Sequence, residues 1–270
     1  MLLSVTPALA TPTDPRLRAI HTWAFAIGNG DLRGDLVKRY AGYDLLVLDG
    51  QETSRQQVQA LRQGGKLVLA YLDVGTIEPY RPWYASLKPY RLNYWPQWGE
   101  WYADVDAAGF RQAIVHRIAP GMLRKGFDGL FLDNTDMIET HRGQTGGMRK
   151  LVAGAARLVH ARHRLLFAQN GEDVIGPMLG YYDGWNREDV SATYDGHGYV
   201  RQPQSEVREA TRALRRMAAK GLLTLATDYV AAGDTATAQL AARDACAAGA
   251  LPFVSDIDLT RIPQVPPRCN

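Results

Sequence analysis

The chain has 270 residues, 46% of them hydrophobic, so it can bury one large core, and its length suits one α/β barrel or two modest domains. Its 31 basic and 28 acidic residues are spread along the chain and leave a formal net charge of +3. Because no basic stripe emerges, the sequence argues against a nucleic-acid partner.

The N-terminal segment MLLSVTPALATPTDP contains a short apolar stretch that ends at Ala8-Leu9-Ala10, a small-x-small pattern typical of a secretory cleavage site. The positively charged segment that normally precedes such a stretch is missing. Residues 1–15 are therefore either the remnant of a signal peptide or an ordinary disordered N-terminus. We favour the first interpretation and expect a secreted or periplasmic protein. No later segment approaches the ~20 apolar residues of a membrane span, so we expect none.

Eight short apolar runs follow in chain order, and most are bounded by glycine-containing turns or polar clusters, which indicates strands. Several runs are continuous rather than alternating, as expected for strands buried on both faces of a parallel sheet. The expected strands cover residues 22–28, 43–49, 66–73, 127–133, 164–170, 181–186, 222–228 and 251–256.

Amphipathic helices are expected between these runs, starting near Thr53, Gly109, Gly147, Ser205 and Asp234. Glycines at 64, 126, 221 and 249 are placed to end four of them. The alternation of strand and helix predicts a (β/α)₈ TIM barrel in a single domain, residues 16–262, followed by a tail at 263–270. An open doubly wound sheet is the alternative, but no Gly-x-Gly-x-x-Gly motif follows the first strand.

Acidic and amide side chains follow most of the expected strands. In a TIM barrel the active site forms where the strands end, so these residues are candidates for the site. A single acid after a strand is often only a loop residue or a helix cap, but several that converge on one rim favour a function. The candidates are Asp49, Asp73, Asp133, Asp136, Asn170, Glu172, Glu188, Asp228, Asp256 and Asp258.

Three of the expected strands share one further pattern, in which a first acid is followed by a second acid five residues later. The pairs are 44 and 49, 128 and 133, and 183 and 188, and two of them begin with aromatic-Asp-Gly. Side chains five residues apart point to opposite faces of a strand. If Asp133 and Glu188 face the barrel mouth, then Asp128 and Asp183 face the other way at the strand starts and have a structural role.

Two reaction classes could use an acidic rim. Glycoside hydrolysis needs two carboxyl groups with different protonation states, and metal-assisted hydrolysis needs clustered hard ligands or histidines. Only His21, His141 and His197 could approach the mouth, so we expect no metal and no cofactor. The two cysteines, Cys246 and Cys269, form no C-x-x-C motif; they are either one disulfide or two packed thiols.

The oversized connection after the third strand, from about residue 78 to 125, holds four of the six tryptophans and five tyrosines. Some of these rings must pack the connection against the barrel, because Trp and Tyr bury large areas. Others can stack on the apolar faces of sugar rings. We expect two or three to reach a substrate and choose Trp95 and Trp101.

Four sequence stretches carry a resemblance to a known family: GFDGLFLDNTD (126–136), the tryptophan-rich W-x-x-W-x-x-WYADV before it, YLDVGTIE (71–78) and YDGWNRE (182–188). Together they resemble the endo-α-1,4-polygalactosaminidase family of glycoside hydrolases, over about residues 23–258. The fourth-strand motif is the most specific of the four. The resemblance implies a TIM barrel and retaining hydrolysis of α-1,4-linked galactosamine polymers, with Asp133 as the nucleophile and Glu188 as the acid/base.

The remaining candidates are expected to bind the substrate, holding its hydroxyl or amino groups or stacking on its rings. Asp136 is a rival nucleophile and Glu172 a rival acid/base. We expect a polysaccharide or oligosaccharide partner and a monomer. A catalytically inactive carbohydrate-binding barrel and a metal-dependent hydrolase or deacetylase are the alternatives. The expected substrate-binding residues are Asp49, Asp73, Asn134, Asp136, Asn170, Glu172, Asp228, Tyr229, Trp95 and Trp101.

Overall fold

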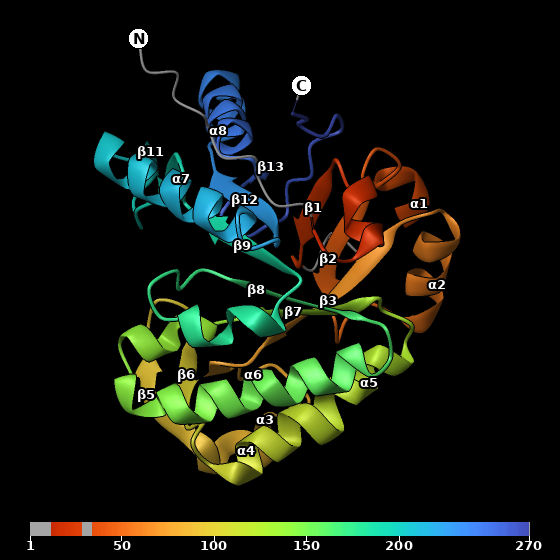
Figure 1. The fold of residues 1–270 in the computed structure, drawn as a ribbon, viewed down its shortest axis with the longest axis vertical. Coiled ribbons are helices and arrows are strands. Elements are labelled where there is room, and N and C mark those ends of the chain that lie inside the picture. The colour runs from red at the N-terminus through yellow and green to blue at the C-terminus, as the bar shows by residue number, and fades with distance from the viewer. Residues whose placement is uncertain (1–11, 29–33, 270) are drawn as a thin grey trace.

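A parallel sheet of eight strands curls into a barrel in the computed structural model, which describes residues 12–28 and 34–269 (Figure 1). In sheet order the strands are β1 (Trp23–Ala26), β2 (Leu45–Asp49), β3 (Leu67–Asp73), β7 (Gly129–Asp133), β8 (Leu165–Gln169), β9 (Gly184–Glu188), β12 (Leu223–Tyr229) and β13 (Leu251–Ser255). The two ends of the sheet meet where the Trp23 indole N–H donates to the carbonyl of Leu251, at 2.8 Å. The predicted TIM barrel is confirmed. The predicted signal segment lies mostly outside the described residues.

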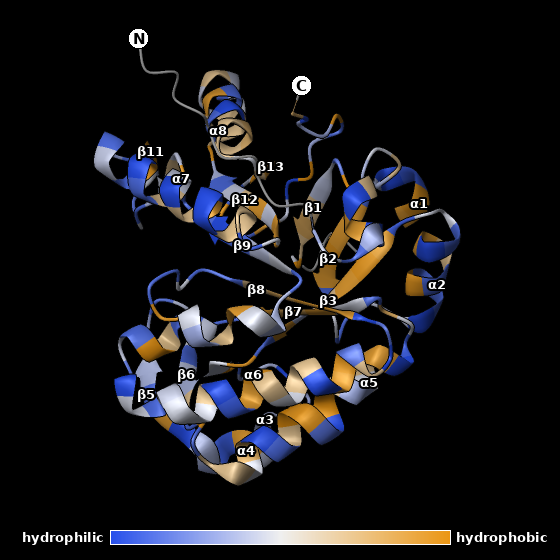
Figure 2. Ribbon diagram, viewed as in Figure 1, coloured by the Kyte–Doolittle hydropathy of each residue, from blue (hydrophilic) through white to orange (hydrophobic). Residues whose placement is uncertain are grey.

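Helices cover the outside of the barrel. Strands β1 to β3 are mainly hydrophobic in Figure 2, whereas α5 and α6 carry both hydrophobic and hydrophilic residues, as expected when one helix face packs on the sheet. The α-helices are α1 (Leu36–Arg39), α2 (Arg55–Gln63), α4 (Ala108–Ala113), α5 (Ala119–Arg124), α6 (Thr145–His160), α7 (Gln204–Ala218) and α8 (Thr235–Ala247), with a π-helical turn, η3 (Ile114–Ile118), joining α4 to α5. A 3₁₀ turn, η1 (Pro15–Ala19), precedes β1.

The strict eightfold alternation of strand and helix is wrong at two places. β8 is followed by the 3₁₀ turn η6 (Gly176–Tyr181), and β13 by an irregular C-terminal segment. Glycines at both 176 and 180, with a proline between them, disfavour an α-helix after β8. Because the turn η6 extends to Tyr181, the sixth strand starts at Gly184, three residues later than expected, and it runs on to Glu188.

The oversized connection after β3 folds into a small layer of its own beside the barrel. It contains an antiparallel sheet in the order β4-β6-β5, visible in part at the lower left of Figure 1. This sheet was not expected from the sequence. Its elements are β4 (Thr76–Ile77), α3 (Tyr84–Leu87), η2 (Lys88–Tyr90), β5 (Arg91–Trp95) and β6 (Glu100–Ala103).

The first acid of each five-residue pair accepts a backbone hydrogen bond from the start of the preceding barrel strand. Asp44, Asp128 and Asp183 each lie just before a strand, at the N-terminal rim. Their carboxylates therefore join neighbouring strands, and for Asp128 and Asp183 this is the structural role predicted from the sequence. The donors are the N–H groups of Thr22 at 3.0 Å, Val68 at 3.0 Å and Leu166 at 2.8 Å.

The glycine that follows two of these acids is required by close packing. A Cβ at Gly129 would lie 2.2 Å from the carbonyl oxygen of Leu165, and a Cβ at Gly184 would lie 2.1 Å from the ring of Phe167. Any larger residue would push the neighbouring strand or ring away. The aromatic-Asp-Gly motif thus combines a strand-joining acid with a residue that leaves room for the neighbour.

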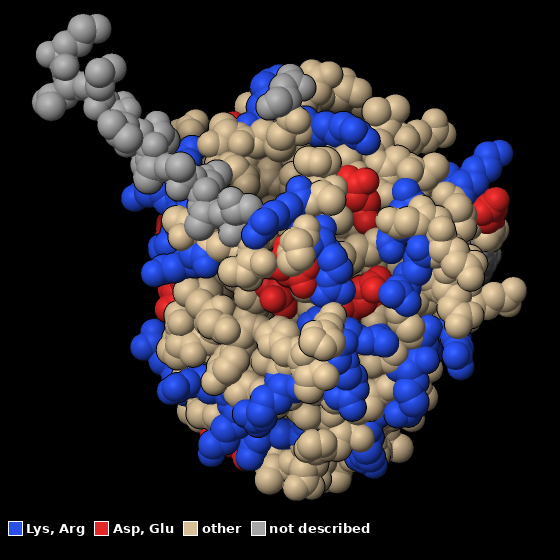
Figure 3. Space-filling view, turned by 45° about the vertical axis from the view of Figure 1, so that its right-hand side comes forward, with Lys and Arg blue, Asp and Glu red and all other residues tan. Residues whose placement is uncertain are grey.

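The C-terminal segment is fastened to the barrel. Cys246 on α8 and Cys269 form a disulfide, which decides between the two interpretations left open above. The Tyr43 hydroxyl also donates to the carbonyl of Pro263 at 2.7 Å. Lys and Arg are scattered over most of the face in Figure 3, and the few acidic side chains gather near its centre. Within the described residues, no helix is both long and apolar enough to cross a bilayer.

Candidate active site

A cavity of about 410 Å³ lies at the C-terminal ends of the barrel strands, where the active site of this fold is expected. The inserted sheet and the turn after β9 add to its wall. It contains both predicted catalytic residues, Asp133 and Glu188. Of the predicted substrate-binding residues it contains Asp73, Asn134, Asp136, Asn170, Tyr229 and Trp95.

Asp133, the last residue of β7, is held by three hydrogen-bond donors. The Tyr71 hydroxyl donates to Oδ2 at 2.6 Å, and the Gln169 amide and the backbone N–H of Asn134 each donate to Oδ1 at 2.6 Å. The pKa of Asp133 is raised above its usual value, because burial outweighs these three donors, which lower it. Hydrogen bonds donated to a carboxylate favour its ionised form, so the frame is built for a negative charge.

The Gln169 side chain is itself fixed by a chain of hydrogen bonds across the barrel interior. Its oxygen accepts from the Asn186 amide at 3.1 Å, and the Asn186 oxygen accepts from the Thr227 hydroxyl at 3.1 Å. Gln169, Asn186 and Thr227 are all buried. Because the Gln169 oxygen is occupied by Asn186, its NH₂ group must face Asp133.

Glu188, the last residue of β9, has a different environment. Asn170 donates to Oε2 at 2.7 Å, and the Tyr229 hydroxyl donates to Oε1. The pKa of Glu188 is raised to about 8, first by burial and then by the negative charge of Asp133. A buried carboxyl next to another negative charge holds its proton near neutral pH.

The two groups therefore differ in their surroundings, although burial raises the pKa of both. β8 lies between β7 and β9, so Asp133 and Glu188 reach the cavity from two strands apart. Asp133 has the donors that stabilise a carboxylate, and Glu188 holds its proton until about pH 8. Carboxyl groups whose environments separate their pKa values can act as a nucleophile and as an acid.

Asp73 and Glu100 share the single hydroxyl of Thr76 at the wall formed by β3 and the inserted sheet. The Thr76 oxygen lies 2.6 Å from Asp73 Oδ2 and 2.6 Å from Glu100 Oε2. A hydroxyl carries one hydrogen, so both bonds can form only if one of the two carboxyl groups is protonated. Burial raises the pKa of Asp73, and it raises the pKa of Glu100 to about 7.

Asp136, the rival nucleophile, also lines the cavity. It lies in the 3₁₀ turn η4 (Thr135–Glu139), which follows β7 and precedes a second short turn, η5 (Arg142–Gln144). Burial and the charge of Asp133 raise its pKa to about 7. A nucleophile must be ionised, so the three-donor frame favours Asp133 over Asp136.

Three aromatic side chains of the inserted layer line the cavity: Tyr80, Trp95 and Trp98. Trp95 stacks on Tyr102, with ring centroids 5.0 Å apart and planes 11° apart. Tyr80 is 68% exposed and Trp98 is 46% exposed, so both rings have surface open to a ligand. This is the arrangement expected of rings that contact a sugar chain.

Trp101, the other tryptophan chosen from the sequence, does not line the cavity. Its ring packs against Tyr94, with centroids 5.0 Å apart, and under the guanidinium of Arg91, 4.5 Å from the centroid. It alternates with Tyr102 along β6 and so faces the other side of the inserted sheet.

Three predicted acids have partners elsewhere and do not line the cavity. Asp49 accepts from the N–H groups of the turn that follows it and pairs with Arg81 at 2.7 Å. Glu172, the rival acid/base, pairs with Arg187 at 2.9 Å. Asp228 accepts from two N–H groups at the end of the turn after β9. Each carboxylate stabilises a loop near the cavity.

Several cavity residues were not identified from the sequence. Tyr71 lies two residues before Asp73 on β3, so the period of a strand could have placed it on the same face. Gln169 was missed because the expected fifth strand ended one residue later, at Asn170. Glu78 and Glu100 lie in the inserted layer, for which the rule of strand ends gives no guide.

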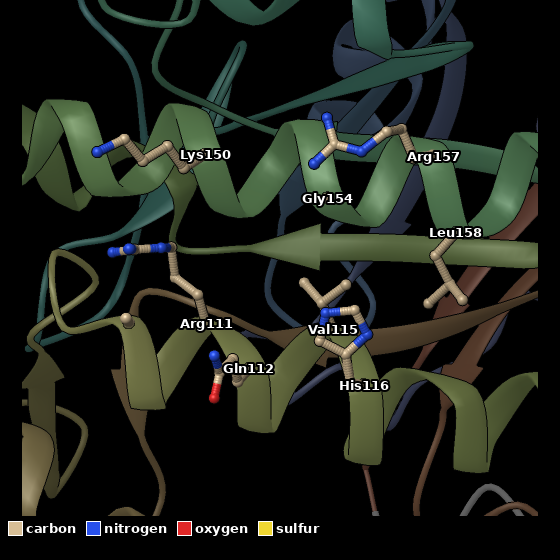
Figure 4. Close-up of a pocket in the computed structure, with 9 residues that line it drawn as sticks. Arg111, Gln112, Val115, His116, Lys150, Gly154, Arg157 and Leu158 are labelled. Carbon is tan, nitrogen blue, oxygen red and sulfur yellow. The ribbon is translucent and has the colours of Figure 1, made fainter.

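A second hollow lies outside the barrel, between the α4–η3 segment and α6 (Figure 4). Arg111, His116, Lys150 and Arg157 line it, and its described lining contains no carboxyl group. It is separate from the cavity that holds Asp133 and Glu188. Among the residues that the structure describes, no group of three or more His, Cys, Asp or Glu is arranged to hold a metal ion.

The barrel and its framed carboxyl pair define the class of TIM-barrel glycoside hydrolases. The chain belongs to glycoside-hydrolase family GH114, whose sequence model matches residues 4–268. This confirms the resemblance found in the sequence. A protein of Deinococcus radiodurans, described as uncharacterised, is 28% identical over 96% of this chain and 88% of its own length.

Solved structures share the fold. The glycoside hydrolase domain of PelA from Pseudomonas aeruginosa aligns with a TM-score of 0.77 and 24% identity, covering 89% of this chain and 96% of that domain. Ega3 from Aspergillus fumigatus, solved in complex with galactosamine, aligns with a TM-score of 0.69 and 17% identity, covering 90% of this chain and 93% of that one.

Proposed function

We propose that this protein is a retaining glycoside hydrolase that cleaves α-1,4-linked galactosamine polymers within the chain. Asp133 is the nucleophile and Glu188 is the acid/base. The observation that carries this assignment is the contrast between the two carboxyl groups: Asp133 has three donors that favour its charge, and the pKa of Glu188 is raised to about 8.

The reaction has two steps. In the first, the Asp133 carboxylate attacks the anomeric carbon while the protonated Glu188 gives its proton to the departing glycosidic oxygen. In the second, the Glu188 carboxylate takes a proton from water, and the water oxygen displaces Asp133 from the sugar. Gln169 and Tyr71 hold Asp133 throughout, since both donate to its carboxylate in the resting protein.

The charge of the cavity supports an amino sugar as the substrate. Eight acids line the cavity, and its described lining contains no Lys or Arg. A cleft with charge of one sign attracts ligands of the opposite sign, and a galactosamine unit carries an ammonium group. The galactosamine bound by Ega3 agrees with this choice. The acids are Asp73, Glu78, Glu100, Asp133, Asp136, Glu188, Asp189 and Asp258.

The remaining predicted residues that line the cavity are proposed as substrate contacts. Asp73, Asn134, Asp136, Asn170 and Tyr229 present polar groups beside the two catalytic carboxyls, and Trp95 presents a ring. The cavity is bordered by exposed rings on one side, so a long chain can extend across it, which supports internal cleavage rather than removal of terminal units.

The test is incubation of the wild type with polymers of galactosamine, N-acetylgalactosamine and glucosamine, and proton NMR of the first product. Cleavage of the galactosamine polymer to shorter chains with the α-configuration retained is expected. Initial formation of the β-anomer would overturn the retaining mechanism. Tight polymer binding without any cleavage would instead favour an inactive carbohydrate-binding barrel.

Variants define the roles of the two carboxyl groups. Asp133→Asn and Glu188→Gln should both abolish cleavage. Added azide should restore turnover of an activated substrate by a Glu188→Ala variant, since azide can attack the sugar without a base to deprotonate it. Glu206→Gln is the matched control, because Glu206 is an exposed acid on α7. Full activity of Asp133→Asn would rule out Asp133 as the nucleophile.

We also propose that the protein works outside the cytoplasm, in the periplasm or after secretion. The disulfide between Cys246 and Cys269 supports this, because disulfides form and persist mainly in oxidising compartments. Fractionation of the native cells, followed by detection of the protein with an antibody, tests it. Recovery of the protein in the cytoplasmic fraction with both thiols reduced would contradict it.

A further inference from the structure

Three neighbouring barrel strands end in the same way. β7, β8 and β9 end at Asp133, Gln169 and Glu188, and each is followed by a residue with left-handed backbone. Non-glycine residues seldom adopt this conformation, and Asn and Asp tolerate it best. The three residues are Asn134 at φ 54°, Asn170 at φ 54° and Asp189 at φ 57°.

The left-handed turn doubles the number of side chains that each strand gives to the site. Adjacent residues in a regular strand point to opposite faces, so only one of each pair would face the barrel mouth. Here the strand-end residue and the left-handed residue after it both line the cavity, at β7, at β8 and at β9.

Asp189 differs from the two asparagines in having an oxygen without a partner. The Asn134 amide donates to Asp73 at 2.6 Å, and the Asn170 amide donates to Glu188 at 2.7 Å. The Oδ1 atom of Asp189 is buried but has no hydrogen-bond partner. Buried polar atoms are nearly always paired, so an unpaired one on a side chain that lines a cavity points to a ligand.

The backbone around Asp189 is held by contacts that do not involve its side chain. Its N–H donates to the carbonyl of Thr227 at 2.9 Å, and its carbonyl accepts from the Gln202 amide at 3.2 Å. The backbone N–H groups of Ser191 and Ala192, two and three residues after Asp189, donate to Asp228. The left-handed conformation should therefore persist when only the side chain of Asp189 is changed.

The charges around Asp189 favour a cationic partner. Glu188 and Asp228 are both close enough for Asp189 to raise their pKa values, and burial raises the pKa of Asp189 itself. A group that both donates a hydrogen bond and carries positive charge would satisfy Oδ1 and relieve this repulsion.

Two neighbours oppose this repulsion only in part. A hydrogen bond with the Thr193 side chain and the charge of Arg187 both lower the pKa of Asp189. Thr193 brings no charge, and the Arg187 guanidinium pairs with Glu172 at 2.9 Å. Neither of them is a hydrogen-bond partner of Oδ1, so this oxygen keeps its capacity to accept from a ligand.

We propose that Asp189 is a specificity-determining residue whose Oδ1 atom binds the ammonium group of an amino sugar unit next to the bond that is cleaved. This proposal rests on the proposed function and assigns to one side chain the preference for an amine over a hydroxyl or an N-acetyl group. Its place beside Glu188 puts it next to the group that protonates the leaving oxygen.

The test compares wild type with Asp189→Asn, which keeps the shape of the side chain, tolerates left-handed backbone and removes the charge. Binding of galactosamine and of galactose is measured by calorimetry in both proteins. Asp189→Asn should weaken galactosamine binding about tenfold, the loss expected for one charge-assisted hydrogen bond, and leave galactose binding unchanged. Glu206→Gln is again the matched control for loss of an acid.

Kinetics on the galactosamine polymer give a second readout that a purely structural role would not move. KM should rise about tenfold, because the lost contact binds the substrate as well as the transition state. The high-pH limb of activity should also move to lower pH, since the charge of Asp189 helps to raise the pKa of Glu188.

The outcomes separate the two proposals. Unchanged galactosamine binding in Asp189→Asn, or an equal loss for galactosamine and galactose, would overturn the assignment of Asp189. A wild type that binds galactosamine through Asp189 but cleaves no polymer would leave this assignment in place and overturn the proposed function.

Discussion

The two rims of the barrel use the same side chains for different purposes. At the N-terminal rim Asp44, Asp128 and Asp183 accept backbone N–H groups from the neighbouring strand. At the C-terminal rim Asp133 and Glu188 face a cavity and are held mainly by side-chain donors, with the backbone N–H of Asn134 as a third donor to Asp133.

The carboxyl groups of the two rims differ in whether they are available to a ligand. The three N-terminal carboxylates are engaged by backbone N–H groups of a neighbouring strand and do not line the cavity. A carboxyl group held from one side by side chains keeps an open side, and its protonation depends on its neighbours. Stability and chemistry are therefore separated to opposite ends of the same strands, five residues apart.

The largest effect should come from Asp133→Asn. Loss of the nucleophile should lower kcat on the galactosamine polymer by at least about 10³-fold, as for other residues that act directly in the reaction. The fold should remain intact, because the change removes a buried charge rather than a strand contact. Initial-rate assays and thermal unfolding followed by circular dichroism check both halves of this expectation.

Asp128→Ala should have the opposite effect to Asp133→Asn: it should lower stability and leave catalysis unchanged. The Val68 N–H would lose its acceptor in a buried place, which should lower the free energy of unfolding by about 2 kcal/mol, measured in urea. The kcat of the remaining folded protein should be unchanged. A large loss of kcat with normal stability would show that the two rims are not separated in function.

Much of this division could be predicted from the sequence. The eight apolar runs indicated the barrel, and the five-residue spacing of Asp128 and Asp133, repeated at Asp183 and Glu188, separated the rims through the period of a strand. The same rule could have identified Tyr71, because it lies two residues before Asp73 on the same strand.

The rest depends on contacts that follow from no local pattern. Asp49 ends β2 as Asp133 ends β7, but it turns back to its own loop and to Arg81, which comes from the inserted layer. Glu100 reaches the site because an antiparallel sheet folds over the barrel mouth. Which strand-end acid faces a ligand is decided by such distant partners.

Gln169→Ala should have an intermediate effect, because it breaks the frame of Asp133 without removing the carboxyl group. With one donor fewer, the ionised form of Asp133 is less stable and its pKa rises. We expect kcat to fall about tenfold to a hundredfold, in line with the loss of one orienting hydrogen bond. The low-pH limb of activity should move to higher pH.

The pH profile is the informative part of that experiment, since a general loss of packing would lower kcat equally at every pH. Gln169→Glu is a useful companion variant. It keeps the length of the side chain but can present a second negative charge to Asp133, so its low-pH limb should move further than that of Gln169→Ala. An unshifted limb in both variants would show that Gln169 does not tune Asp133.

The last effect is on stability rather than on activity and concerns Glu188→Gln. The pKa of Glu188 is raised from the ordinary value of 4.5 to about 8, so between these values the folded protein holds a proton that the unfolded chain releases. The free energy of unfolding of the wild type must then fall as pH rises through this range. The glutamine in the variant has no proton to lose, and the other titrating groups are present in both proteins.

The melting temperature of Glu188→Gln should therefore exceed that of the wild type by an amount that grows from pH 5 to pH 8. By linkage, a pKa shift of this size is worth about 4 kcal/mol between pH 5 and pH 8, or roughly 8–16 °C in a domain of this size. A difference that stays constant over this range would mean that Glu188 is not protonated in the resting site, and the contrast with the N-terminal rim would then lose its electrostatic basis.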